Sequence, residues 1–215
     1  MIEVKSLSKS IKKTKVLNDI NLKLEKNKIY GFLGSNGSGK TMLFRALCGL
    51  IRPNTGEIKI DNKILYKEID VPPSVGVIIE NPGFWDNLNG FENLKLLSKI
   101  KNSINDEGIK VAIERVGLNP EDHRTYKKYS LGMKQRLAVA QAIMEKPDLL
   151  ILDEPTNALD EDGVELIRSL LLEEKKRGAT ILIASHNKDD INILSDKIFK
   201  VKAGCLNEVE GDTIS

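Results

Sequence analysis

A glycine-rich run at residues 34–41 has the clearest chemical pattern in the chain. It reads GSNGSGKT, which matches G-x-x-x-x-G-K-[ST], and it lies between an apolar strand-like run (28–33) and a helical pattern (41–50). Such glycines let backbone N–H groups turn inward around phosphate oxygens, and the helix N-terminus adds its positive dipole end. An ordinary glycine-rich turn is the alternative, and this context disfavours it. We therefore expect a nucleotide-binding loop made of Gly34, Ser35, Asn36, Gly37, Ser38, Gly39, Lys40 and Thr41.

Two side chains of this run have specific expected tasks. Lys40 would supply a point charge for the β- and γ-phosphates, and the Thr41 hydroxyl would ligate Mg²⁺. A second run, LLILDEP at residues 149–155, ends an apolar strand in two carboxylates. Asp153 would hold Mg²⁺ through water, and Glu154 would orient or deprotonate the attacking water. Taken alone, this run is equally a strand that ends in a solvated acidic turn, but beside a phosphate loop the catalytic reading is favoured.

The elements that must position these residues follow from apolar spacing. The first 30 residues alternate apolar and polar, which is typical of antiparallel strands with one solvated face. Between residues 91 and 144 the spacing is helical, in three groups. Short apolar strands at 148–152 and 180–184 flank an amphipathic helix at 164–176, which predicts a βαβ unit with parallel strands. The helical block is therefore expected to be an insertion within an α/β core.

The composition excludes several classes of protein. The 215 residues are 40% apolar and 30% charged, which argues against disordered, collagen-like and membrane-embedded chains. A formal net charge of +2 argues against a dedicated nucleic-acid binder. Cys48 and Cys205 form no Cys-x-x-Cys pair, so we expect neither a zinc site nor a disulfide framework, which fits a reducing cytosol. No signal peptide or long apolar run is found in the sequence, so another chain would have to hold this one at a membrane.

Three further runs make the chain resemble the ATP-binding cassette (ABC) family. SLGMKQR at residues 130–136 lies between the two motifs, and NALD (157–160) and SH (185–186) follow the second. The family signature usually reads Leu-Ser-Gly-Gly-Gln, and residues 129–133 keep its serine and one glycine. The resemblance covers nearly the whole chain. It implies an α/β fold, namely a P-loop NTPase core with an N-terminal antiparallel β-subdomain and an inserted α-helical subdomain.

The resemblance also implies how the chain is organised and paired. One ABC ATPase domain would span residues 1–215, with 91–146 as the helical subdomain and 1–90 and 147–215 as the core and β-subdomain. Two such domains pair head to tail, so that each ATP lies between the glycine loop of one subunit and the signature helix of the other. Ser130 and Gly132 would then bind phosphate at a helix N-terminus, and Asp160 would join the nucleotide site. A plain N-cap is the alternative for Ser130.

Three residues stand where the family has functional side chains. His186 ends the last apolar strand, where the family places a hydrogen-bond donor to the γ-phosphate, and we expect it to be catalytic. Glu80 replaces the usual glutamine and puts an acid near Mg²⁺, so it is a candidate metal ligand with Thr41 and Asp153. Ile11 replaces the aromatic residue that usually stacks on adenine and can keep only an apolar contact. His123 is expected to be a solvated loop residue.

The resemblance narrows the function further. Glu80, the run NPGF at 81–84 and the run SLGMKQR resemble the bacitracin and lantibiotic self-protection branch. The expected protein is an ATP- and Mg²⁺-dependent subunit, cytoplasmic and peripheral to the membrane, that drives a separate permease and pairs with an identical or related ATPase chain. A soluble ABC ATPase acting on nucleic acid or ribosomes is the alternative, but the small net charge and the lack of long heptad runs disfavour it. A P-loop kinase or GTPase would leave the signature unexplained.

Overall fold

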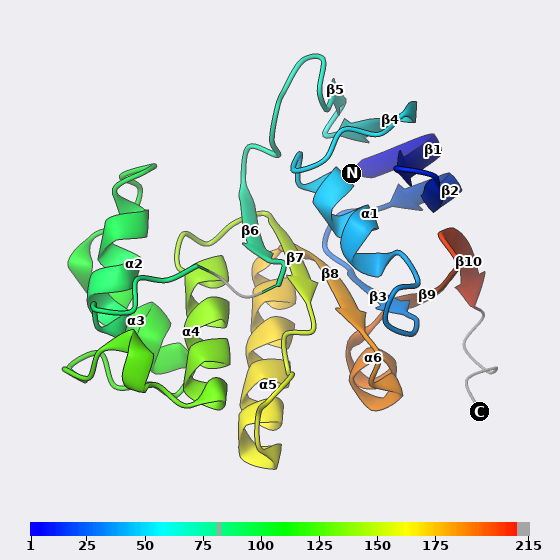
Figure 1. The fold of residues 1–215 in the computed structure, drawn as a ribbon. Coiled ribbons are helices and arrows are strands. Elements are labelled where there is room, and N and C mark those ends of the chain that lie inside the picture. The colour runs from blue at the N-terminus through cyan, green and yellow to red at the C-terminus, as the bar shows by residue number, and fades with distance from the viewer. Residues whose placement is uncertain (81–82, 210–215) are drawn as a thin grey trace.

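The computed structural model describes residues 1–80 and 83–209 and contains two sheets joined by helices. The smaller sheet has the order β2-β1-β4-β5, and the larger has the order β10-β9-β3-β8-β7-β6 (Figure 1). The strands are β1 (Ile2–Ile11), β2 (Thr14–Leu24), β3 (Ile29–Leu33), β4 (Thr55–Ile60), β5 (Lys63–Ile64), β6 (Val75–Ile78), β7 (Leu149–Asp153), β8 (Thr180–Ser185), β9 (Lys197–Lys202) and β10 (Cys205–Val209). The helices are α1 (Lys40–Leu47), α2 (Gly90–Ser98), α3 (Asp106–Arg115), α4 (Leu131–Ile143), α5 (Glu161–Arg177) and α6 (Lys188–Leu194), with a 3-10 turn at Tyr126–Lys128.

The smaller sheet is antiparallel and solvated on one face. β1 pairs with β2 and with β4, and the buried residues Ile2 and Val4 stand opposite Leu24 and Leu22. Buried and exposed positions alternate along the end of β2, as expected for strands with one wet face. The predicted antiparallel N-terminal sheet is therefore confirmed.

The larger sheet carries the phosphate loop and the strand-end carboxylates. β3, β6, β7, β8 and β9 run parallel, and β10 returns antiparallel to β9. β8 is buried along its whole length because both faces of this sheet are covered. The unit β7–α5–β8 is the predicted βαβ unit, with Leu149–Asp153 aligned to residues 180–184. The carboxyl ends of these strands therefore meet at one edge, which lies at the bottom of Figure 1.

Two hydrophobic cores lie on the two faces of the larger sheet. One contains α1 between this sheet and the smaller sheet, with Phe32 and Phe44 in edge-to-face contact at 5.2 Å. The other joins the sheet to α4, α5 and the rest of the helical block. In Figure 1 α2, α3 and α4 stand to the left of the sheet. The close packing of α4 on β6 requires Gly76, since a Cβ there would lie 1.8 Å from the carbonyl oxygen of Ala142. The expected α/β fold with an inserted helical block is confirmed.

Candidate functional site

The glycine-rich run forms the turn between β3 and α1. Gly39 is the N-cap residue of α1, with φ at 115°, and no side chain caps this helix. The other α-helices of the described residues all have a side-chain cap, from Asn89, Asn105, Ser130, Asp160 and Asn187. The first-turn N–H groups of α1 therefore keep their hydrogen-bonding capacity for an anion.

A cavity of about 410 Å³ opens above this turn. The ammonium group of Lys40 is buried there at 6% exposure and donates to the carbonyl oxygens of Gly34 and Ser35. The Ser38 hydroxyl is buried in the same turn without a partner among the described residues. The positive charge of Lys40 and the free hydroxyl of Ser38 suit a polyanionic ligand. The cavity is lined by Val16, Ser35, Asn36, Gly37, Ser38, Gly39, Lys40, Thr41, Met42, Asp153 and Glu154.

Neighbouring backbone holds the loop in this shape. The N–H of Gly204, in the turn between β9 and β10, donates to the carbonyl oxygen of Ser38 at 2.8 Å. A Cβ at Gly39 would lie 2.8 Å from the carbonyl oxygen of Val16, and its left-handed φ also favours glycine. The loop is thus seated on β2 and on the β9–β10 turn by contacts within the chain, and such preorganisation lowers the entropy cost of binding.

Thr41 and Asp153 form the part of the site that suits a divalent cation. The Thr41 hydroxyl donates to Asp153 Oδ2 at 2.6 Å. Burial raises the pKa of the Asp153 carboxyl, and the nearby charges of Glu154 and Glu80 raise this pKa further, while the Thr41 hydrogen bond opposes the rise. In the described part of the chain, no group of three or more His, Cys, Asp or Glu side chains is arranged to hold a metal ion. One carboxylate and one hydroxyl fit Mg²⁺, which binds proteins through few ligands and takes the rest from water and phosphate.

Glu154 and His186 lie in direct contact at the carboxyl ends of β7 and β8. His186 Nδ1 is 2.9 Å from Glu154 Oε1, and the backbone N–H of His186 donates to the same oxygen at 3.0 Å. The Ser185 hydroxyl donates to Oε2 at 3.2 Å. Glu154 has a left-handed φ of 52°, a conformation that costs a non-glycine residue roughly 1 kcal/mol or more unless its surroundings impose it. Strain at this position is typical of a functional residue.

Glu80 lies at the edge of this site, in an ion pair. Its Oε1 is 2.7 Å from the guanidinium of Arg45 on α1, and its side chain is 60% exposed. It is absent from the cavity lining, although its charge contributes to the raised pKa of Asp153. Residues 81–82, which follow it in the run NPGF, lie outside the described residues. Arg45 is a partner that the sequence pattern did not indicate.

The signature residues lie at a second, separate cavity. Ser130 caps α4, accepting from the N–H of Met133 at 3.1 Å, and Gly132 lies near it in the first turn of that helix. Asp160 caps α5 by accepting from Gly163 and pairs with Arg136 at 3.0 Å. This cavity of about 470 Å³ shares no lining residue with the loop cavity, so one chain does not bring Ser130, Gly132 and Asp160 to the loop. It is lined by Gly117, Leu118, Asn119, Asp122, Arg124, Ser130, Gly132, Met133, Arg136, Ala158 and Asp160.

Ile11, the residue expected to contact adenine, lies away from the loop cavity. Ile11 is 43% exposed at the tip of the β1–β2 hairpin, opposite Thr14, and does not line the loop cavity. Val16, on the other side of this hairpin, does line it. The motif alignment pointed to Ile11, and no signal in the sequence separated the two apolar side chains.

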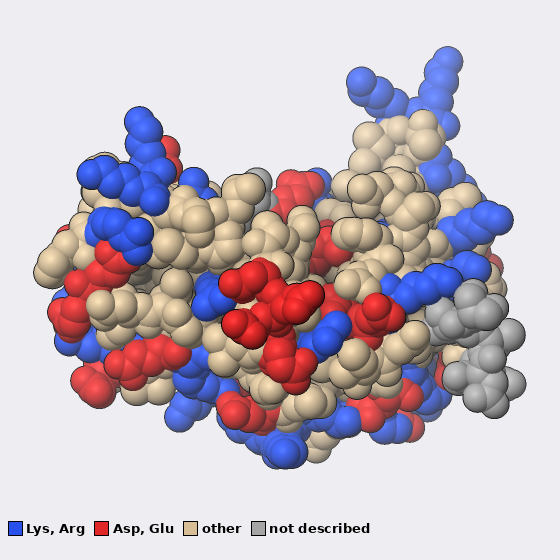
Figure 2. Space-filling model, turned by 90° about the horizontal axis from the view of Figure 1, so that it is seen from below, with Lys and Arg blue, Asp and Glu red and all other residues tan. Residues whose placement is uncertain are grey.

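The face that carries the loop is negatively charged near its middle. Figure 2, seen from below Figure 1, shows acidic side chains gathered there. The N-terminal end of α5 contributes Asp160, Glu161 and Asp162, all exposed, which suits the positive end of that helix. This field repels a free nucleotide, so attraction must come from Lys40 and the N-terminus of α1.

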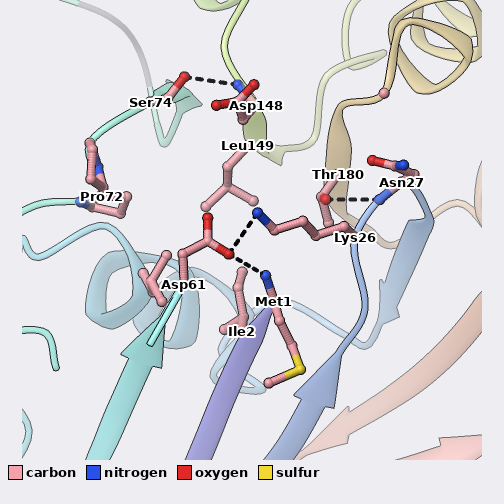
Figure 3. Close-up of a pocket in the computed structure, with 13 residues that line it drawn as sticks. Met1, Ile2, Lys26, Asn27, Asp61, Pro72, Ser74, Asp148, Leu149 and Thr180 are labelled. Atoms are coloured by element: carbon pink, nitrogen blue, oxygen red, sulfur yellow. Dashed lines mark hydrogen bonds and ion pairs between the residues drawn. The ribbon is translucent and has the colours of Figure 1, made fainter. Parts of the chain in front are cut away.

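A third cavity, of about 330 Å³, lies at the opposite edge of the larger sheet (Figure 3). Its walls come from segments that precede β3, β6, β7 and β8, including Lys26, Ser74 and Asp148, and from Asp61 of the smaller sheet. Lys26 pairs with Asp61 at 2.9 Å. None of the expected site residues lines it, so it is separate from the nucleotide site.

The fold and the seated loop define a nucleoside triphosphatase of the phosphate-loop class. A family model described as ABC transporter matches residues 17–157, and the chain belongs to that family. It is an ATP-binding subunit of an ABC transporter, and it hydrolyses ATP. No helix in the described residues has the length and apolar content of a membrane span.

Curated relatives agree with this assignment, and solved structures share the fold. The chain is 55% identical over 210 residues to the uncharacterized ABC transporter ATP-binding protein YybJ of Bacillus subtilis (strain 168), covering 98% of this chain and 96% of that protein. It is 43% identical over 210 residues to the bacitracin transport ATP-binding protein BcrA of Enterococcus faecalis, covering 97% of this chain and 68% of BcrA. The dimeric post-hydrolysis structure of the ATP-binding cassette MJ0796 bound to ADP and Pi shares the fold, with a TM-score of 0.89, 22% identity and full coverage of both chains.

Proposed function

We propose that this chain powers the export of a peptide antibiotic, such as bacitracin or a lantibiotic, through a separate membrane permease. The observation that carries the proposal is the 43% identity to BcrA over nearly the whole chain. A lantibiotic transport protein, SrtF of Streptococcus pyogenes, is 36% identical over 92% of this chain and 85% of SrtF. The subunit would act at the cytoplasmic face of the membrane, with no nucleic acid as partner.

The export proposal is tested in cells that carry the permease. Deleting the gene should lower the concentration of bacitracin or lantibiotic that stops growth, and the parent gene should restore it. A Glu154→Gln copy should not restore it, because export requires hydrolysis. Unchanged sensitivity of the deletion strain to a panel of such peptides would contradict the proposed substrate class and leave the ATPase assignment intact.

The site residues have distinct roles in this proposal. Residues 34–41 bind the phosphates, with Lys40 neutralising the β- and γ-oxygens. Thr41 and Asp153 would hold Mg²⁺, which neutralises developing phosphate charge when bound. Glu154 activates the attacking water, and His186, which contacts Glu154, donates to the γ-phosphate. Val16 supports this assignment of the loop cavity by offering an apolar wall to the nucleotide.

We also propose that two cassettes, identical or related, form the active unit head to tail. The support is the separation of the two cavities, since the signature cavity and the loop cavity share no residue in one chain. Ser130 and Gly132 of one chain would then complete the loop site of the other. In this arrangement residues 91–146 act as a subdomain that presents the signature to the partner.

Mixing two inactive variants should restore hydrolysis. Lys40→Ala disables the loop, and Gly132→Asp puts a carboxylate where the partner's phosphate would bind. A mixed dimer still contains one site with an intact loop and an intact signature, so we expect partial activity. Steady-state phosphate release measures it, with each variant alone as the control. Activity no higher than the sum of the two variants would count against head-to-tail pairing.

Glu80 should make nucleotide binding depend on Mg²⁺. Its carboxylate repels the γ-phosphate unless a cation lies between them, and Arg45 offsets this charge only partly because the pair is exposed. We expect Glu80→Gln to keep ATPase activity within about tenfold and to bind ATP better than the parent at low Mg²⁺.

The matched change is Arg45→Gln, which leaves Glu80 without its cation. This variant should depend on Mg²⁺ more steeply than the parent, opposite to Glu80→Gln. Titration of ATP affinity against Mg²⁺ for all three chains decides the matter. Superimposable curves would show that Glu80 is an exposed strand-end acid with no part in metal binding.

A further inference from the structure

The first turns of α4 lie against the segment that follows Glu154. A Cβ at Gly132 would lie 3.2 Å from the carbonyl oxygen of Ala158. One turn further on, Gln135 Nε2 donates to the carbonyl oxygens of Glu154 and Pro155, each at 3.0 Å. The signature helix and the turn that carries Glu154 therefore form one connected unit within the chain.

Gln135 binds the part of that segment that contains Glu154. Both hydrogens of its side-chain amide are used, one on each of two consecutive carbonyl oxygens. The first of these belongs to Glu154, whose φ of 52° lies in the left-handed region. Pro155 has no N–H to anchor the turn from its own side. The amide of Gln135 thus holds the backbone from which the Glu154 carboxylate extends, together with the backbone hydrogen bonds that Glu154 makes with Ala184 and Asn157.

A neighbouring contact from the same helix is weaker. Arg136 pairs with Asp160, but the Asp160 side chain is 73% exposed, so solvent and salt screen that pair. Gln135 is half-buried, and its hydrogen bonds are neutral and directed. Gln135 therefore gives a displacement of α4 a direct route to the backbone of Glu154.

We propose that Gln135 is a positioning residue that couples the two ATP sites of the dimer. This inference rests on the proposed head-to-tail pairing, in which α4 of each chain closes over the ATP held by its partner while Glu154 serves the ATP of its own chain. Closure at one site moves α4, and the Gln135 amide carries that movement to the Glu154 turn at the other site. Each site then becomes competent for hydrolysis when the opposite site is filled.

The test compares Gln135→Glu with a matched change on the same helix. Gln135→Glu keeps the length of the side chain but sets a carboxylate against two carbonyl oxygens, so the contact becomes repulsive. Gln141→Glu is the control, because the Gln141 side chain makes no hydrogen bond with the described residues. ATP hydrolysis is measured across ATP concentration, together with ATP binding to the monomer.

The expected result separates coupling from a structural role. The parent should show a Hill coefficient clearly above about 1, as two coupled sites allow. Gln135→Glu should lower it to about 1 and reduce kcat roughly 10- to 100-fold, because the base is misplaced. The ATP affinity of the monomer should stay within about twofold, since the loop is untouched. Gln141→Glu should match the parent throughout.

The opposite results overturn the proposal. A Gln135→Glu chain with the Hill coefficient and kcat of the parent would remove Gln135 from the coupling, and a parent coefficient of about 1 would remove the coupling itself. Light scattering on Glu154→Gln with ATP is run in parallel. Failure of that chain to dimerise contradicts the pairing, whereas dimerisation with an unaffected Gln135→Glu contradicts only the role of Gln135.

A second pair of variants keeps the test valid if Gln135→Glu is too unstable to measure. If Gln135→Glu has a lowered unfolding midpoint, Gln135→Met and Gln135→Lys replace it. Methionine has similar length without donors, and lysine can still donate to both carbonyl oxygens. Cooperativity should be lost in the methionine variant and retained in the lysine variant. Equal Hill coefficients for these two folded variants would contradict the proposal.

Discussion

Glu154→Gln is expected to bind ATP normally and to hydrolyse it roughly 10²- to 10⁴-fold more slowly than the parent. The carboxylate lies at the carboxyl end of β7, beside Asp153 and Thr41, with its oxygens held by Ser185 and His186. The amide keeps the shape of the side chain but cannot accept a proton from water. Single-turnover hydrolysis and equilibrium ATP binding, measured on the same preparation, separate the two effects.

The control for this change is an acid on the surface of the helical block. Glu114 on α3 is exposed, and its side chain makes no ion pair with the described residues, so Glu114→Gln should hydrolyse ATP like the parent. A Glu154→Gln chain that retained more than about a tenth of parental turnover would be inconsistent with a general base at this position.

Lys40→Ala should lose both binding and hydrolysis. The ammonium group is buried inside the loop, where it faces the carbonyl oxygens of Gly34 and Ser35. Its removal takes away the loop's own positive charge, beside the acidic side chains near the middle of the face that carries the loop (Figure 2). We expect ATP affinity to fall roughly 10- to 100-fold, which corresponds to the loss of one or two charge-assisted hydrogen bonds. We expect kcat to fall by about 10²-fold or more.

Titration calorimetry measures the affinity, and thermal unfolding without nucleotide checks the fold. Lys99, an exposed lysine that directly follows α2, provides the control, and Lys99→Ala should bind ATP like the parent. Parental affinity in a folded Lys40→Ala chain would exclude the glycine-rich run as the phosphate site.

The sequence predicted the fold well because its strongest patterns are local. The run GSNGSGKT needs only the strand before it and the helix after it, and the structure has β3 and α1 at these places. The alternation in residues 1–30 likewise predicted the antiparallel strands. Such features depend on neighbours in the chain, so period and motif suffice to find them.

Local sequence patterns did not predict the contacts between segments that are far apart in the chain. Arg45 meets Glu80, and Gln135 meets Glu154, only because α1 and α4 pack on the larger sheet. Val16 rather than Ile11 lines the loop cavity because of the way β2 and the hairpin tip lie beside the loop. The packing that creates these pairs has no periodic signature, so a single sequence gives no sign of them.

The loop cavity and the signature cavity are, in this account, two halves of one ATP site. In the proposed pairing, the loop, Thr41, Asp153 and Glu154 would bind ATP and activate water within one chain, whereas Ser130 and Gly132, which line a separate cavity, would serve a second chain. Such a division would make hydrolysis depend on pairing, and pairing depend on ATP. Transport would then follow from the movement of two cassettes toward each other and apart.

The most direct test of this account is the mass of the Glu154→Gln chain in solution, measured by light scattering with and without Mg-ATP. Without nucleotide the chain should have its own mass of 24.0 kDa. With saturating Mg-ATP it should have twice that mass, because ATP bridges the loop of one copy and the signature of the other and is not hydrolysed. The same sample with Gly132→Asp added should stay at the lower mass. A Glu154→Gln chain that binds Mg-ATP and remains monomeric, alone and with its transporter partner chains, would contradict the account.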